Sequence, residues 1–337
     1  MTVLESAEQL RSRLKVVGLS ARAIKAAWPR WWTAEADRSL SARVDLRFSV
    51  ARHLGLDPRS LLDPGQSPRF IWAGDARFKH LSHEGEMELA VLASFGRAVG
   101  SILLQALKAD AVPARLPASE LRSVLLGEDR PFIQLVDLLS LCWSLGIPVI
   151  HLRVFPWPQK RMAAMTVRVE KRTAILLAQD SQYPAQTAFY LAHELGHTML
   201  GHLAERSVIV DLEEKMLETA AGDLEENLAD AYGLELLTGD PKLTVRPASS
   251  ASSARELARV VLAAGPELQI EPGTLALCFG YSTQRWRTTF AAMRLIYTFP
   301  KQVWVEVNHL ARRELDFSRL PDDAGAYLDA ILGSPEK

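Results

Sequence analysis

The sequence predicts an α+β protein that is mostly helical, with a small antiparallel or mixed sheet packed on one central helix. Apolar residues recur at helical spacing over much of the chain, for example in residues 40–56 and 87–109. Two short β-rich runs, Met165–Val169 and Thr173–Ala178, flank a polar turn. A helix predicted to begin near Pro184 follows them directly, so we expect it to pack on the sheet.

The elements fall into three predicted regions. Residues 1–125 form a helical N-terminal region that Pro and Gly interrupt. Residues 126–240 contain a helix over 131–145, a strand over 149–155, the two β-rich runs, and helices over 184–203 and 212–237. A stretch with two prolines and a serine run, residues 239–253, is the predicted linker. Residues 254–337 form a helical C-terminal region, with one helix starting at Pro272.

The composition is that of an ordinary globular protein. The chain has 337 residues, 48% of them hydrophobic, and a formal net charge of −1, so no global field indicates nucleic acid or membrane. Its two cysteines, Cys142 and Cys278, form no disulfide framework. The N-terminus lacks the pattern of a signal peptide, and no apolar run is long enough to span a bilayer. We therefore expect a cytoplasmic protein without a membrane partner.

One motif indicates metal chemistry. The segment Leu191–His197 contains the pattern His-Glu-x-x-His. Residues four apart share a helix face, so His193 and His197 can direct imidazole nitrogens at one Zn²⁺ ion. Glu194 is the adjacent residue, placed to take a proton from metal-bound water. The flanking residues are small or apolar, which favours a buried site helix over two unrelated core histidines.

A catalytic zinc site normally has three protein ligands, so one more is expected downstream. Glu226 and Asp230 lie four residues apart on the next predicted helix. We expect Glu226 to complete the site and Asp230 to accept a hydrogen bond from a ligand imidazole, which would fix that ring's orientation. Glu225 is expected on a solvated face. His202, five residues after His197, is the rival third ligand.

Residues 130–240 resemble the ImmA/IrrE zinc metallopeptidases. The resemblance rests on Leu-Gly-Ile-Pro-Val, then Ala-His-Glu-Leu-Gly-His-x-x-Leu-Gly-His, then Glu-x-x-Ala-Asp-x-Tyr-Gly-x-x-Leu-Leu. It implies a zincin-like fold around the His-Glu-x-x-His helix. It also implies that His193, His197 and Glu226 bind Zn²⁺ and that Glu194 is the catalytic base.

The chain departs from the family's pattern at three positions that are not ligands. Asp230, Tyr232 and Gly233 stand where Asn, Phe and Ala are common. Family members typically cleave a helix-turn-helix repressor in response to DNA damage, phage or other stress, and some accompany phage-defence operons. The resemblance therefore implies a cytoplasmic zinc endopeptidase whose protein substrate is a cognate repressor.

The N-terminal region has a basic bias. Residues 1–60 contain eleven Lys and Arg against six Asp and Glu, a net charge of +5. Two segments are loosely similar to helix-turn-helix repressors, although Pro29 would interrupt a recognition helix. One interpretation is a helical packing domain whose basic face is solvated and whose three neighbouring tryptophans belong to the core. The other is a DNA-binding region, since cations and tryptophans suit phosphate binding and base stacking, and DNA is then a possible activator. The expected contacts are Arg22, Lys25, Arg30 and Arg43.

Two functions of different classes remain open from the sequence. The first is a zinc endopeptidase with a regulatory region at each end. The alternative is a DNA-binding transcription regulator that uses the peptidase-like domain to bind a partner. Glu194 favours the enzyme, because a zinc site used only for binding has no need of a base.

Overall fold

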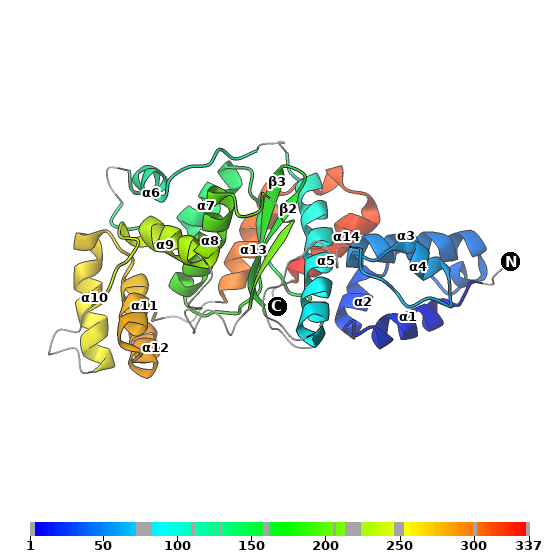
Figure 1. Ribbon diagram of the computed structural model, residues 1–337, viewed down its shortest axis with the longest axis horizontal. Helices are drawn as coiled ribbons and strands as arrows, with labels where there is room; N and C mark the ends of the chain where they lie inside the picture. Colours follow the sequence, from blue (N-terminus) through cyan, green and yellow to red (C-terminus); the bar gives the residue numbers. More distant parts are fainter. Residues whose placement is uncertain are drawn as a thin grey trace.

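The computed structural model describes residues 4–71, 83–108, 112–127, 130–157, 162–204, 207–212, 224–245, 253–298 and 302–334. It confirms the α+β class, since helices surround a four-stranded mixed sheet. The elements extend along one axis, with α1–α4 (residues 7–62) at one end, the sheet in the middle and α10–α12 (residues 254–296) at the other end (Figure 1).

The sheet has the strand order β1-β3-β2-β4. β2 (Met162–Val169) and β3 (Arg172–Leu177) form an antiparallel hairpin, in which Glu170 takes a φ of 57°. β1 (Val149–His151) pairs parallel to β3, and β4 (Val208–Leu212) pairs antiparallel to β2. Among the described strands, the two outer ones are β1 and β4.

Helices cover both faces of the sheet, as Figure 1 shows for α5 and α8. α5 (His83–Gln105) packs on the face that carries Met165 and Val167. It approaches closely because Gly96 and Gly100 lack side chains; a Cβ at Gly96 would lie 2.1 Å from the sulfur of Met165. α8 (Pro184–Leu200) packs on the opposite face of β2 and β3. The motif helix α8 therefore packs on a sheet whose opposite face is covered by α5.

The helix α8 begins and ends as its sequence dictates. Pro184 occupies the first turn, where no intrahelical N–H donor is needed, and Gly201 closes the helix with a φ of 78°. α9 (Leu224–Thr238) packs against α8 more extensively than any other helix does. The predicted helix over 212–237 is confirmed from Leu224 onward as α9, whereas its first residue, Leu212, is the last residue of strand β4 (Val208–Leu212). The intervening residues lie outside the described part of the chain.

Two predicted elements are shorter than expected. The predicted helix over 131–145 is α7, Leu135–Ser144, and the predicted strand over 149–155 is only β1. The chain leaves the sheet because the Arg153 amide donates to the carbonyl of Ile331 instead of to a strand. The remaining helices are α1 (Ala7–Val16), α2 (Ala21–Ala27), α3 (Leu40–Leu54), α4 (Pro58–Leu62), α6 (Ala118–Leu126), α10 (Ala254–Leu268), α11 (Pro272–Thr283), α12 (Trp286–Ile296), α13 (Val303–Glu314) and α14 (Asp322–Leu332).

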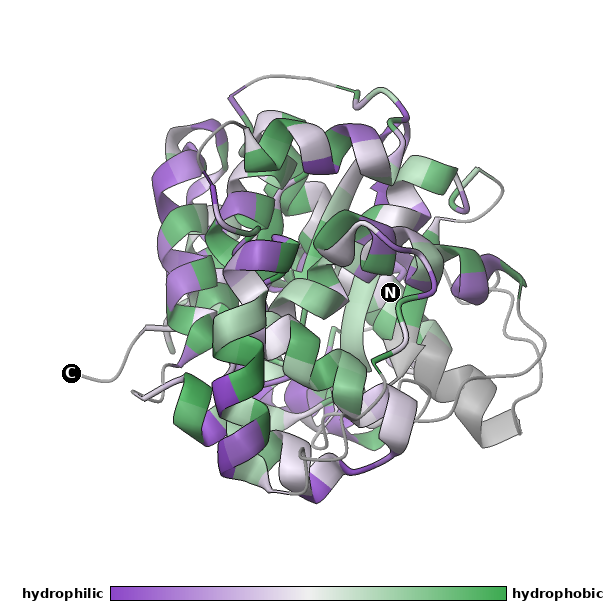
Figure 2. Cartoon of the chain, turned by 90° about the vertical axis from the view of Figure 1, so that its left-hand side faces the viewer, coloured by the Kyte–Doolittle hydropathy of each residue, from purple (hydrophilic) through white to green (hydrophobic). Residues whose placement is uncertain are grey.

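These helices pack by burying apolar stripes. α10–α12 contact one another around a small core of their own, and α14 returns to pack on α2, α3 and α5. Viewed from the α10–α12 end, the helices carry both hydrophobic and hydrophilic segments (Figure 2). Within the described residues, no helix is long and apolar enough to cross a bilayer. The division at 125 and 240 stays a prediction.

Both cysteines are buried and free. Burial raises the pKa of the Cys142 and Cys278 thiols to about 12. They therefore behave as small apolar side chains within the cores.

The contact between α8 and α9 yields a stability prediction. A Cβ at Gly196 would lie 3.0 Å from the carbonyl oxygen of Ala229, whereas at Gly325 of α14 the nearest atom is 3.9 Å away. Gly196→Val should lower the free energy of unfolding by about 1–3 kcal/mol, because the backbone of α9 cannot easily move aside for the added side chain. Gly325→Val, a matched change in a helix, should alter it by less than about 1 kcal/mol. Urea denaturation measures both, and equal effects would contradict this account of the interface.

Candidate metal centre

Three side chains from two helices converge at the centre of the molecule. His193 and His197 are buried on α8, and Glu226 reaches them from α9. The two imidazole Nε2 atoms are 3.0 Å apart. Glu226 Oε2 lies 3.4 Å from Nε2 of His193 and 3.7 Å from Nε2 of His197. In the described part of the chain, this is the group of His, Cys, Asp and Glu side chains arranged so that it could hold a metal ion.

These separations fit a tetrahedral metal site. Zinc bonds to nitrogen and oxygen are about 2.0–2.1 Å long, so tetrahedral ligand atoms stand about 3.3 Å apart. The three measured separations lie on either side of that value. Two imidazole nitrogens and a carboxylate oxygen also form a donor set that catalytic zinc sites use. The residues therefore fit a zinc ion with one open position.

The other ring nitrogen of each histidine has its own partner. Nδ1 of His193 lies 2.7 Å from Oδ1 of Asp230, and Nδ1 of His197 lies 2.9 Å from Nδ1 of His202. A ligand imidazole that binds through Nε2 keeps its proton on Nδ1 and donates it to such a partner. Asp230 and His202 can therefore orient the two rings.

The position of His202 depends on how α8 ends. Gly201 adopts the left-handed conformation that turns the chain back toward His197. A Cβ at this position would lie 2.2 Å from the guanidinium carbon of Arg115. Arg168 of β2 donates to the carbonyls of Leu203 and Ala204 and ties the turn to the sheet. This geometry favours Glu226 over His202 as the third ligand, because His202 approaches Nδ1 and not Nε2.

Charge at the site favours cation binding. Burial by itself would raise the pKa of Glu226, but hydrogen bonds with His193 and His197 outweigh it and hold the pKa below its usual range. Glu226 is therefore ionised in the neutral pH range. An anionic oxygen therefore faces two imidazole nitrogens. A divalent cation bound between these atoms would be attracted by the negative charge.

Glu194 is fully buried against the sheet. Its Oε2 accepts a hydrogen bond from the hydroxyl of Thr166 on β2. The same hydroxyl oxygen lies 3.3 Å from the backbone carbonyl oxygen of Glu194. Sequence reasoning missed this partner, because Thr166 precedes Glu194 by 28 residues and looks like an ordinary strand residue. Thr166 can orient the carboxylate as Asp230 and His202 orient the rings.

A tyrosine from the C-terminal region also approaches the site. Tyr281 of α11 packs on Phe189 of α8, with ring centroids 5.8 Å apart. Burial raises the pKa of the Tyr281 phenol, and Tyr190 and Asp230 raise it further. The phenol is therefore protonated near neutral pH and able to donate. Sequence reasoning missed it because α11 lies about 50 residues beyond the predicted metal ligands.

The expected DNA contacts lie in different surroundings. Arg22 and Lys25 are exposed on α2, and Arg30 is exposed beside Asp329. Arg43 instead pairs with Asp37 at 3.2 Å and donates to the carbonyl of Leu4, so its guanidinium faces the protein. The tryptophans near α2 pack together, with centroids of Trp31 and Trp32 5.6 Å apart. DNA binding by this region stays a prediction.

Comparison with known proteins adds no family assignment. No family model matches the chain, and no curated protein matches it significantly. The functional interpretation therefore depends on the motif residues and on the geometry of the site.

Metal analysis can test the ligand assignment. Purified protein should contain about one zinc ion per chain, and Glu226→Ala should lose most of it, because two histidines alone form an incomplete site. Glu225→Ala, at the neighbouring position on α9, is the matched control and should retain the metal. His202→Ala should keep the stoichiometry but bind zinc about 10–100-fold more weakly, as expected for an orienting residue. Full zinc in Glu226→Ala together with loss in His202→Ala would reverse the assignment.

Proposed function

We propose that this chain is a zinc-dependent endopeptidase of the ImmA/IrrE kind. The observation that carries the proposal is the convergence of Glu226 on α9 with His193 and His197 on α8, the helix that also bears Glu194. A binding-only site would need the three ligands but not an adjacent buried carboxylate. The fold supports the proposal further, because the motif helix packs on the two inner strands, β2 and β3, of a small mixed sheet.

Each residue has a defined role in the proposed hydrolysis. Zinc, when bound, supplies Lewis acidity that polarises the scissile carbonyl and acidifies water. Glu194 accepts a proton from the attacking water at its carboxylate while the water oxygen bonds to the carbonyl carbon. The same carboxylate then delivers that proton to the leaving amine as the C–N bond breaks. Thr166 donates a hydrogen bond to Glu194 Oε2 and can hold the carboxylate in place for the proton transfer.

The outer strand β4 offers a place for the substrate backbone. Ile209 of β4 pairs with Thr166 of β2, and Thr166 contacts Glu194. Neighbouring strands in a sheet are about 4.8 Å apart, so a peptide added to β4 would run one strand beyond it. Backbone hydrogen bonds would hold an extended peptide with little dependence on its sequence. An unfolded or exposed loop of a protein substrate suits this arrangement.

We further propose that the substrate is a cognate helix-turn-helix repressor, cleaved in the cytoplasm after a stress or DNA signal. This substrate and setting come from the motif resemblance. The exposed cations Arg22, Lys25 and Arg30 offer a surface for a phosphate backbone. DNA bound there would lie near α2, at the opposite end of the molecule from α10–α12 (Figure 1).

The role of Glu194 has a direct test. Glu194→Gln keeps the size and most hydrogen bonds of the side chain but cannot accept the proton. Cleavage of the proposed repressor substrate should fall by about 10²–10⁴-fold, while zinc content and melting temperature remain those of the wild type. Glu225→Gln is the matched control and should cleave normally. Undiminished cleavage by Glu194→Gln, measured by mass spectrometry of the products, would remove Glu194 from the mechanism.

The DNA signal can be tested in the same assay. Cleavage should rise when single-stranded DNA is added, and the rise should shrink steeply between low and moderate salt, because phosphate contacts release counterions. The triple change of Arg22, Lys25 and Arg30 to Ala should abolish the rise without changing basal cleavage. A matched control changes Arg255, Arg294 and Arg313, which lie on other helices. Equal rates with and without DNA at both salt concentrations would contradict the proposed activator.

A further inference from the structure

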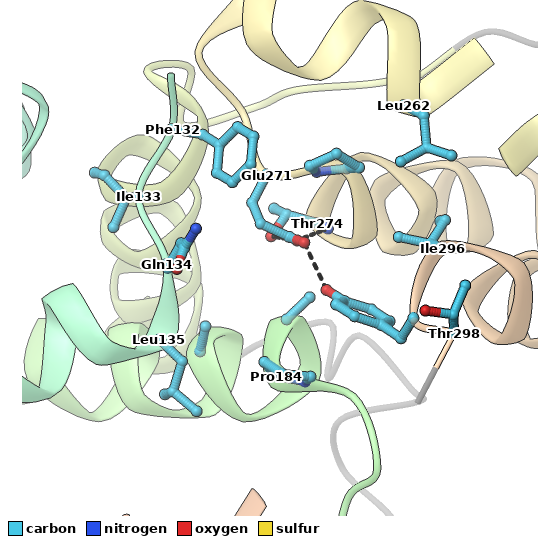
Figure 3. Close-up of a pocket in the computed structure, with 14 residues that line it drawn as sticks. Phe132, Ile133, Gln134, Leu135, Pro184, Leu262, Glu271, Thr274, Ile296 and Thr298 are labelled. Carbon is cyan, nitrogen blue, oxygen red and sulfur yellow. Dashed lines mark hydrogen bonds between the residues drawn. The ribbon is translucent and has the colours of Figure 1, made fainter. Parts of the chain in front are cut away.

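A second cavity lies beside the N-terminal part of α8, away from the metal ligands. Its volume is about 400 Å³, within the range of small-molecule sites. The walls come from the start of α7, the first turns of α8, and α10–α12 (Figure 3). Most of the wall is apolar, including Phe132, Leu135 and Ile296. The cavity is therefore built where the C-terminal helices meet the motif helix.

One carboxylate interrupts the apolar wall. Glu271 caps the N-terminus of α11, and its Oε2 accepts hydrogen bonds from the amide and the hydroxyl of Thr274 at 2.7 and 3.2 Å. Its Oε1 accepts a hydrogen bond of 2.6 Å from the phenol of Tyr297, drawn as a dashed line in Figure 3. A carboxylate has about four acceptor positions, so one remains on Oε1.

All three donors to Glu271 are neutral groups. Among the described residues, no Lys, Arg or His forms an ion pair with this carboxylate, whose hydrogen-bond partners are Thr274 and Tyr297. Burial raises the pKa of the Tyr297 phenol, and the Glu271 charge raises it further, so the phenol remains a donor. A half-buried carboxylate without a cationic partner favours a positive charge beside it.

The aromatic residues at the cavity are fixed in place. The ring of Tyr297 packs on Tyr183, with centroids 5.8 Å apart, and Gly273 allows its hydroxyl to reach the start of α11. A Cβ at Gly273 would lie 2.2 Å from that hydroxyl. Aromatic faces attract cations, so Tyr297 and Phe132 add to the preference set by Glu271.

We propose that this cavity binds a small organic ammonium ion with an apolar body, with the ammonium group at Glu271 Oε1. The apolar part would contact Ala185 and Ala188 on α8. Ala188 precedes His193 by five residues, about 7.5 Å along the helix axis. Such a ligand would join the C-terminal helices to the helix that carries the metal ligands. The site is independent of the peptidase proposal, because binding needs neither metal nor catalysis.

The test uses the full chain and three probes of one shape. Isothermal titration calorimetry would compare phenethylammonium, 2-phenylethanol and 3-phenylpropanoate. We expect one saturable site for the ammonium ion, at least about tenfold weaker binding of the alcohol, and no binding of the carboxylate, since hydrogen bonds to charged groups are the stronger ones. Glu271→Gln keeps hydrogen-bonding capacity at the helix cap and should remove the preference for the ammonium ion. Glu267→Gln, an exposed site on α10, is the matched control and should preserve it.

A second variant keeps the test independent of the helix cap. Ala188→Leu fills part of the cavity and should weaken binding of both the ammonium ion and the alcohol. Equal affinity of the two probes for the wild type, unchanged ammonium binding in Glu271→Gln, or the absence of saturable binding would each overturn the proposal.

Discussion

The close contact between α8 and α9 is the constraint on which the metal centre depends. Gly196 faces Ala229 of α9, and a Cβ at Gly233 would lie 3.2 Å from the amide nitrogen of His193. Glu226, Asp230 and Gly233 recur at helical spacing and so share one face of α9. The packing of Gly233 against α8 therefore determines how closely the carboxylates of Glu226 and Asp230 approach the two imidazoles.

The sheet supplies the second support. α5 packs on one face and α8 on the other, so that β2 is enclosed between two helices. Thr166 on β2 offers the buried Glu194 a hydrogen-bond donor, which lowers the cost of keeping a carboxylate away from water. Asp230 and His202 likewise offer hydrogen-bond partners to the two imidazole rings. Each side chain of the candidate site is thus oriented by a partner from a different element or turn.

The sequence allowed the local parts of this site to be predicted. His193, His197, Glu226 and Asp230 follow helical spacing within two helices, and spacing of that kind is visible without a structure. The α+β class followed from the same patterns. Partners that depend on tertiary contacts, such as Thr166 and Tyr281, were missed because no local pattern connects them to the motif. The strand β4 was missed as well, although its Val-Ile-Val run has the β-branched residues typical of strands.

The central claim is that two imidazoles and one carboxylate bind a single zinc ion. X-ray absorption at the zinc edge of the purified full chain measures the ligand atoms directly. The account predicts a four-coordinate ion with only nitrogen and oxygen neighbours at about 2.0–2.1 Å and with two imidazole rings in the scattering pattern. Three imidazole rings would show that His202 ligates the metal, and a sulfur neighbour or six oxygen neighbours would contradict the site altogether.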